Sequence, residues 1–138
     1  EKAPDRENMN LQGIRVLLVE DVEFNIMVAE KMLNSWNAKV DIAENGLAGL
    51  GKAKQNNYDV ILMDLQMPVM DGYSAAKAIR DFDTRTPIIA LTASASIDMQ
   101  HKAIEYGMND FVSKPFNPYD LYNIVFKYTL EAPSRIKP

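Results

Sequence analysis

The sequence contains no cysteine, so neither a disulfide framework nor a thiolate metal site can hold this chain together. It also lacks an apolar run of about 18 residues, the minimum for a membrane-spanning helix, and a charged-then-apolar leader. The complete phosphate-loop pattern G-x-x-x-x-G-K-[ST] is absent as well, which disfavours a nucleotide triphosphatase. We therefore expect a cytoplasmic domain that makes no membrane contact.

Basic residues are not in excess. Fifteen lysines and arginines stand against nineteen acidic residues, and the net charge of −4 supplies no general attraction to phosphate backbones. Direct nucleic-acid binding is therefore not expected. The chain has 138 residues, of which 47% are hydrophobic, so it can form one domain with a sizeable core.

The two ends of the chain differ in composition from the part between them. Residues 1–12 are polar, carry Pro4 and show no apolar period, which predicts a flexible linker. Residues 132–138 contain two prolines and are interpreted as a flexible tail. The domain itself is predicted to span residues 13–131.

Within that domain, short apolar runs alternate five times with longer stretches of helical period. Helices are expected to begin near Glu23, Gly46, Tyr73, Ile97 and Asn117. Most of the strands are continuously apolar, as strands of a parallel sheet covered by helices on both faces are. The expected strands are Ile14 to Val19, Ala38 to Ala43, Val60 to Met63, Ile88 to Leu91, and Phe111 to Val112.

This alternation predicts a single α/β domain with a doubly wound, five-stranded parallel sheet and five helices. In the flavodoxin-like strand order 2-1-3-4-5, the first and third strands are neighbours. A ligand site is then expected outside the carboxyl ends of the strands.

Chemically active side chains stand at those carboxyl ends: Glu20 and Asp21, Asp64, Thr92, and Lys114. Three carboxylates in one pocket repel each other, and either raised pKa values or a divalent cation such as Mg²⁺ would relieve the repulsion. Asp64 is the best nucleophile candidate because it directly ends an apolar strand. A cation and Lys114 could offset the charge on a transferred phosphoryl group, to which Thr92 could donate a hydrogen bond.

At this point the chain resembles the receiver domains of response regulators and hybrid histidine kinases, over roughly Ile14 to Leu130. The resemblance rests on four segments: LLVED at 17–21, MDLQMP at 63–68 followed by MDG at 70–72, ALTA at 90–93, and SKPF at 113–116. Asn25 and the segment GMNDF at 107–111 are most similar to receivers of hybrid histidine kinases.

The resemblance implies a two-component phosphorelay in which Asp64 accepts a phosphoryl group from a histidine of a kinase or phosphotransfer domain. Asp21 would bind Mg²⁺ directly, Glu20 through water, and Gln66 through its backbone carbonyl. Thr92 and Lys114 would hold the phosphoryl group, and a cis peptide is implied at Lys114-Pro115. Such a domain is not a classical enzyme by itself, but a self-phosphorylating acceptor with slow autodephosphorylation. Part of a hybrid histidine kinase, including the cytoplasmic part of a membrane-bound sensor, and a free-standing regulator are both open at this point.

Two positions depart from the commonest family pattern. Glu20 replaces an aspartate and can still reach a metal-bound water, while Phe111 replaces a tyrosine that, with Thr92, acts as a switch. Only a hydrogen-bonded switch is put in doubt by the missing hydroxyl.

Three other classes of protein fit these residues less well. A phosphohydrolase would need a second acid where Gln66 stands. A flavodoxin-like binding module would need a phosphate loop where Glu20 and Asp21 would repel the phosphate. A degenerate receiver would not keep the acids and the lysine.

A docking surface for the histidine-bearing partner is also predicted. In the first helix, Phe24, Ile26 and Met27 fall off the apolar stripe that would face the core, so they are expected to be exposed near Asp64. Together with Phe116, they are predicted to form the seat for a helical bundle.

Overall fold

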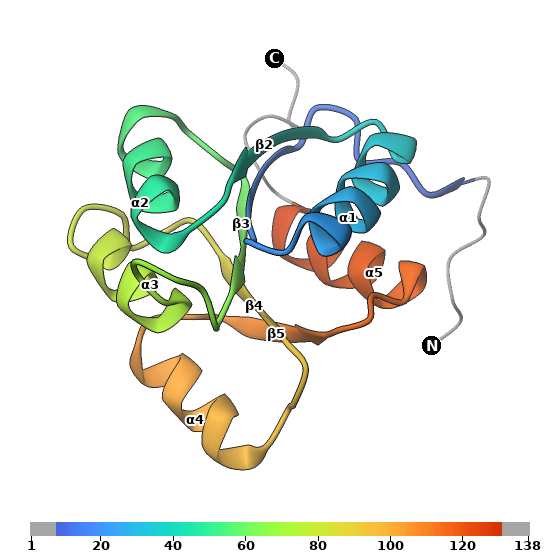
Figure 1. The fold of residues 1–138 in the computed structure, drawn as a ribbon. Coiled ribbons are helices and arrows are strands. Elements are labelled where there is room, and N and C mark those ends of the chain that lie inside the picture. Colours follow the sequence, from blue (N-terminus) through green and yellow to red (C-terminus); the bar gives the residue numbers. More distant parts are fainter. Residues whose placement is uncertain (1–7, 131–138) are drawn as a thin grey trace.

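A computed structural model describes residues 8–130, in which five strands and five helices alternate along the chain (Figure 1). The strands are β1 (Arg15–Val19), β2 (Lys39–Ala43), β3 (Val60–Asp64), β4 (Ile88–Thr92) and β5 (Asp110–Ser113). The helices are α1 (Glu23–Ser35), α2 (Gly46–Gln55), α3 (Gly72–Arg80), α4 (Ile97–Glu105) and α5 (Pro118–Thr129). Every expected element is present, and its start differs from the expected residue by at most one position.

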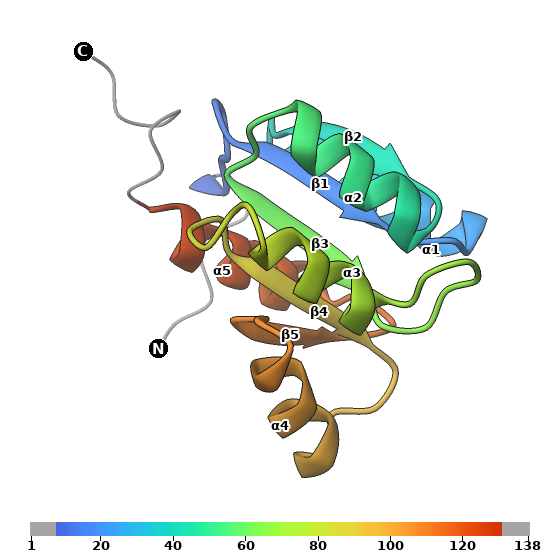
Figure 2. The same cartoon turned by 90° about the vertical axis from the view of Figure 1, so that its left-hand side faces the viewer.

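The strands form one parallel sheet in the order β2-β1-β3-β4-β5, which confirms the predicted topology. Helices α1 and α5 cover one face of the sheet, and α2, α3 and α4 cover the other (Figures 1 and 2). None of the helices among residues 8–130 is long and apolar enough to cross a membrane.

Two hydrophobic cores lie on the two faces of the sheet. In β1, Val16 and Leu18 belong to the core under α1 and α5, whereas Leu17 and Val19 belong to the core under α2 and α3. All four side chains are fully buried. The run of apolar residues in this strand is continuous because successive side chains point to opposite faces of the sheet and helices cover both faces, as the sequence predicted.

The segment before β1 differs from the expected flexible linker. Met9 and Leu11 are buried in the core under α1 and α5, and the Leu11 amide donates to the Trp36 carbonyl at 2.6 Å. The Asn10 amide donates to the hydroxyl of Tyr122 at 3.2 Å. Two apolar residues in a short irregular segment are too few to form a recognisable period, so the packed domain begins before residue 13. Residues 1–7 and 131–138, which include the expected tail, lie outside the described residues.

Local sequence signals set the helix ends that surround the sheet's carboxyl edge. The side chains of Asn45, Asp71 and Ser96 each accept a hydrogen bond from a backbone amide in the first turn of α2, α3 and α4. At the opposite edge of the sheet, Gly107, with a φ of 94°, follows the end of α4; its amide donates to the Ile104 carbonyl and the next amide donates to the Ala103 carbonyl.

Candidate functional site

The carboxyl ends of β1, β3, β4 and β5 meet at one cleft of about 410 Å³. Its lining includes Asp21, Asp64, Gln66, Thr92 and Lys114, which come from segments up to 93 residues apart. The fold thus brings these sequence-distant side chains together at one cleft, as predicted. The order of the strands places β3 between β1 and β4, and so brings Asp64 to the centre of the group.

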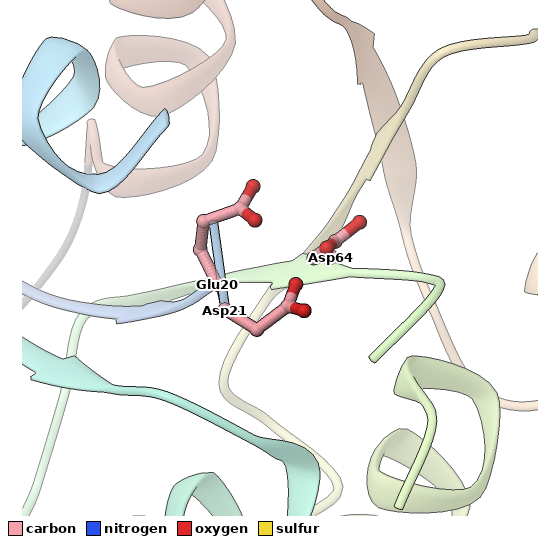
Figure 3. Close-up of side chains that lie close together, drawn as sticks. All are labelled: Glu20, Asp21 and Asp64. Carbon is pink, nitrogen blue, oxygen red and sulfur yellow. The ribbon is translucent and has the colours of Figure 1, made fainter. Parts of the chain in front are cut away.

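Three carboxylates form a cluster in this cleft. Glu20, Asp21 and Asp64 each place one oxygen within 4.8 Å of the others (Figure 3). Glu20 is fully buried and Asp64 is only 3% exposed. The Val22 amide donates to Oε2 of Glu20 at 3.0 Å, which holds that carboxylate at the end of β1.

This donor set fits a hard divalent cation. Oδ1 of Asp21 is buried without a hydrogen-bond partner among residues 8–130, and a buried polar atom of this kind requires a partner. Several carboxylate oxygens around a cleft open to water are what Mg²⁺ binds, because that ion keeps part of its hydration shell. The nearby acids would otherwise repel each other at low dielectric.

Lys114 forms ion pairs with two of the three carboxylates. Its Nζ lies 2.9 Å from Oδ1 of Asp64 and 3.4 Å from Oε1 of Glu20. Burial alone would lower the pKa of Lys114, but the hydrogen bond to Asp64 and the charges of Asp64 and Glu20 raise it above its ordinary value. Lys114 is therefore charged and held in place.

The peptide bond Lys114-Pro115 is cis, as predicted. The backbone amide of Lys114 donates to the Thr92 carbonyl at 2.7 Å, so the lysine continues the β4–β5 ladder at its carboxyl end. The side chain can then reach across to the acids of β1 and β3.

Asp64 is the buried acid of the group. Burial raises the pKa of Asp64 above its ordinary value, and the charge of Glu20 adds to the rise although the hydrogen bond from Lys114 opposes it. A carboxylate in a cleft whose pKa is shifted by burial and by named charged neighbours is a candidate for a functional role. The amide of Gln66 approaches Oδ1 of the same carboxylate at 3.4 Å.

Three further residues with predicted roles lie at the cleft or in the core beside it. Thr92 is buried at the end of β4, and its hydroxyl donates to the Ser94 carbonyl at 2.7 Å. Gln66 lines the cleft, while the metal-binding role of its carbonyl stays a prediction. Phe111 is half-buried and packs against the core under α2 and α3, and its switch role with Thr92 also stays a prediction.

The predicted docking surface needs two corrections. Phe24 and Met27 are 65% and 56% exposed, but Ile26 is half-buried and packs against the core under α1 and α5. Phe116 is only 9% exposed and belongs to that same core. Both side chains are covered within that core, and the pattern of a single segment does not show which of its side chains a neighbouring element covers.

Sequence reasoning missed two features of the cleft. Gly72 begins α3, and its amide donates to the Leu65 carbonyl at 3.1 Å, a contact that the segment MDG at 70–72 did not indicate. Tyr73 and Met99, from α3 and α4, line the cleft although no motif contains them. Only the position of Tyr73 directly after an Asp-Gly pair could have suggested it.

The family follows from comparison with known proteins. Residues 16–126 match the family model of the response regulator receiver domain. The chain therefore belongs to the response regulator receiver domain family. The fold and the acidic cleft described above agree with that membership.

Among curated proteins, the hybrid signal transduction histidine kinase G of Dictyostelium discoideum is 40% identical over 129 residues, 90% of this chain. Transcription factor SKN7 of Saccharomyces cerevisiae is 37% identical over 117 residues, 85% of this chain. The matched parts are 4% and 19% of those two proteins, so the chain spans a small share of their length.

Two solved structures are informative neighbours. The receiver domain of a sensor histidine kinase from Pseudomonas aeruginosa, with magnesium coordinated in its active-site cleft, has a TM-score of 0.81 and 40% identity; the match covers 86% of this chain and 99% of that one. The receiver domain of Ssk1 from Saccharomyces cerevisiae, solved in complex with the histidine phosphotransfer protein Ypd1, is also similar. Its TM-score is 0.81 with 31% identity, covering 89% of this chain and 97% of that one.

Proposed function

We propose that this domain accepts a phosphoryl group on Asp64 from a histidine of a kinase or of a phosphotransfer domain, with Mg²⁺ bound beside it. The observation that carries the proposal is the buried Asp64 carboxylate, 2.9 Å from the ammonium of Lys114, within a cluster of three acids. Receiver domains of two-component systems perform this step, and the structure of the neighbour with magnesium in its cleft supports the choice of cation.

Glu20, Asp21 and Asp64 would hold the cation, together with the backbone carbonyl of Gln66. Bound there, Mg²⁺ would offset part of the charge of the acidic cluster and would stabilise negative charge on the phosphoryl oxygens. Asp21 would contribute the buried oxygen that has no partner among residues 8–130.

In the transfer, an oxygen of Asp64 attacks phosphorus in line with the leaving nitrogen of the donor imidazole. The phosphorus–oxygen bond forms while the phosphorus–nitrogen bond breaks, and the imidazole nitrogen keeps the electron pair and then takes up a proton. Lys114 stays charged and accompanies the transferred oxygens. The hydroxyl of Thr92, which donates to Ser94 in the structure, can rotate to donate to the phosphoryl group.

The donor must reach Asp64, so its docking surface has to border the cleft. Phe24 and Met27 stand in the first two turns of α1, directly after Asp21, and are exposed apolar side chains. They support a helical, histidine-bearing partner that buries them. The complex of a similar receiver with a histidine phosphotransfer protein supports the class of partner.

The proposal includes no contact with nucleic acid or membrane by this domain, because its net charge is −4. We place the reaction in the cytoplasm, since the phosphoryl groups of histidine kinases derive from ATP held there. Hybrid kinases among the relatives support a setting in which this domain forms part of a longer kinase.

Incubation with acetyl phosphate and Mg²⁺, followed by intact mass measurement, tests the proposal. Wild type should gain one phosphoryl group of about 80 Da per molecule, and Asp64→Asn should gain none, because an amide cannot form the acyl phosphate. Asp41→Asn is a matched control at a carboxylate on β2 outside the cleft. Labelling of Asp64→Asn equal to wild type would refute the assignment.

A further inference from the structure

Helix α4 is weakly anchored although it borders the functional cleft. Among the five helices of residues 8–130 it has one buried residue, Ala103, whereas the others have two to four. Ile97 and Ile104 are 69% and 66% exposed. An element with so few buried contacts needs other interactions to keep its position.

A cluster of two tyrosines and two lysines supplies such an interaction across the seam between α3 and α4. The rings of Tyr73 and Tyr106 lie 5.5 Å apart. The Nζ of Lys102 lies 4.3 Å from the centroid of the Tyr73 ring and 5.9 Å from that of Tyr106. Lys77 approaches the Tyr106 ring at 5.8 Å. Tyr73 and Lys77 come from α3, Lys102 comes from α4, and Tyr106 is the residue that caps the end of α4. The two helices lie on the same face of the sheet (Figure 2).

This cluster is connected to the cleft on both sides. Tyr73 itself lines the cleft, as do Ser96 and Met99 at the start of α4. The Nε2 of Gln100 donates to the Ala95 carbonyl at 2.9 Å, which joins the second turn of α4 to the loop that follows Thr92. The position of α4 therefore determines the shape of the wall next to the Thr92 hydroxyl.

We propose that Lys102 is a positioning residue for phosphoryl acceptance, because it bridges Tyr73 and Tyr106 and so holds α4 and the loop after Thr92 in the receptive arrangement. The inference rests on the proposed function of Asp64 and adds to it a residue outside the cleft. Without the bridge, α4 occupies the receptive arrangement for a smaller fraction of the time. The apparent affinity for the phosphoryl donor falls by that fraction.

The variant Lys102→Gln removes the cation and keeps a long side chain. Loss of one cation–π contact at an exposed site changes the equilibrium between the receptive and other arrangements of α4 about threefold. We expect the concentration of acetyl phosphate for half-maximal labelling to rise about threefold at saturating Mg²⁺, with the maximal rate unchanged. Hydrogen exchange of the α4 amides in the absence of donor should accelerate by a similar factor. Lys102→Arg, which keeps the cation over the rings, should restore both values.

Two further variants separate positioning from other effects. Tyr106→Leu keeps every charge and does not alter the cleft lining. If the contacts between Lys102 and the two rings hold α4, this variant should also require more acetyl phosphate for half-maximal labelling and show faster exchange of the α4 amides. If Lys102 acted only by attracting the anionic donor, Tyr106→Leu would be silent. Lys54→Gln is the matched control, because Lys54 lies over the Phe82 ring at 5.8 Å, away from α4 and from the cleft.

The proposal is overturned if Lys102→Gln leaves α4 exchange unchanged, or if exchange accelerates while labelling does not change. A silent Tyr106→Leu variant would also overturn it. If wild type itself were not labelled, the proposed function of Asp64 would fail, whereas the exchange comparison would still report on the bridge.

Discussion

Gly72 packs directly against the backbone carbonyl of Asp64. A Cβ at residue 72 would overlap that carbonyl oxygen and would lie 2.9 Å from the Cα of Leu65. The first residue of α3 therefore touches the backbone of the phosphoacceptor candidate. Only glycine permits this approach, because every other residue carries a Cβ.

The close approach predicts that Gly72→Ala destabilises the fold and slows labelling of Asp64, because the end of β3 must shift. Overpacking of this kind costs about 1–3 kcal/mol. Gly51→Ala is the control: it lies within α2, nothing stands within 4 Å of its Cβ position, and alanine there should stabilise the protein by about 0.5–1 kcal/mol. Urea unfolding of both variants measures the two effects, and equal stabilities would contradict the prediction.

Asp21 is expected to dominate magnesium affinity. Wild type should bind Mg²⁺ with a dissociation constant of about 1 mM or tighter, and Asp21→Ala should weaken binding about tenfold or more, because one of three carboxylates is lost. Phosphorylation by acetyl phosphate should slow in parallel. Calorimetric titration provides the measurement. Glu105→Ala removes the same charge from an exposed position outside the cluster, and undiminished binding by Asp21→Ala would exclude the metal assignment.

Met27→Glu should slow phosphotransfer from a histidine-bearing partner about tenfold or more, because a charge would be buried at the docking surface. Labelling by acetyl phosphate should stay nearly unchanged, since a small donor needs no docking surface. Leu47→Glu, at a residue of α2 with a similar exposed fraction of 53%, controls for the loss of any surface hydrophobe. Equal losses with both donors would indicate damage to the cleft instead.

The packed segment before β1 predicts that Leu11→Ala lowers the free energy of unfolding by about 2–5 kcal/mol, as deletion of a fully buried leucine does. Gln12→Ala, one residue later and exposed, should change it by about 0.5 kcal/mol or less. Chemical unfolding followed by circular dichroism distinguishes the two. A flexible linker at these positions would make both substitutions silent.

Much of the fold and the candidate site was predictable because its signals are local. The continuous apolar runs in β1, β3 and β4 reveal strands covered on both sides, and the polar residue that ends each run marks the carboxyl edge. In a parallel sheet these ends meet at one edge, so Asp21, Asp64 and Lys114 could be brought together without coordinates.

Packing between separate elements was not predictable in the same way. The sequence by itself determined which residues end the strands, and hence the acids and the lysine of the cleft. Only the tertiary structure decided that Met9, Ile26 and Phe116 are covered in the core under α1 and α5, and that Lys102 meets Tyr73 across the seam between α3 and α4. The physical reason is that periodicity reports which face of one element is apolar, whereas burial depends on where a second element crosses it.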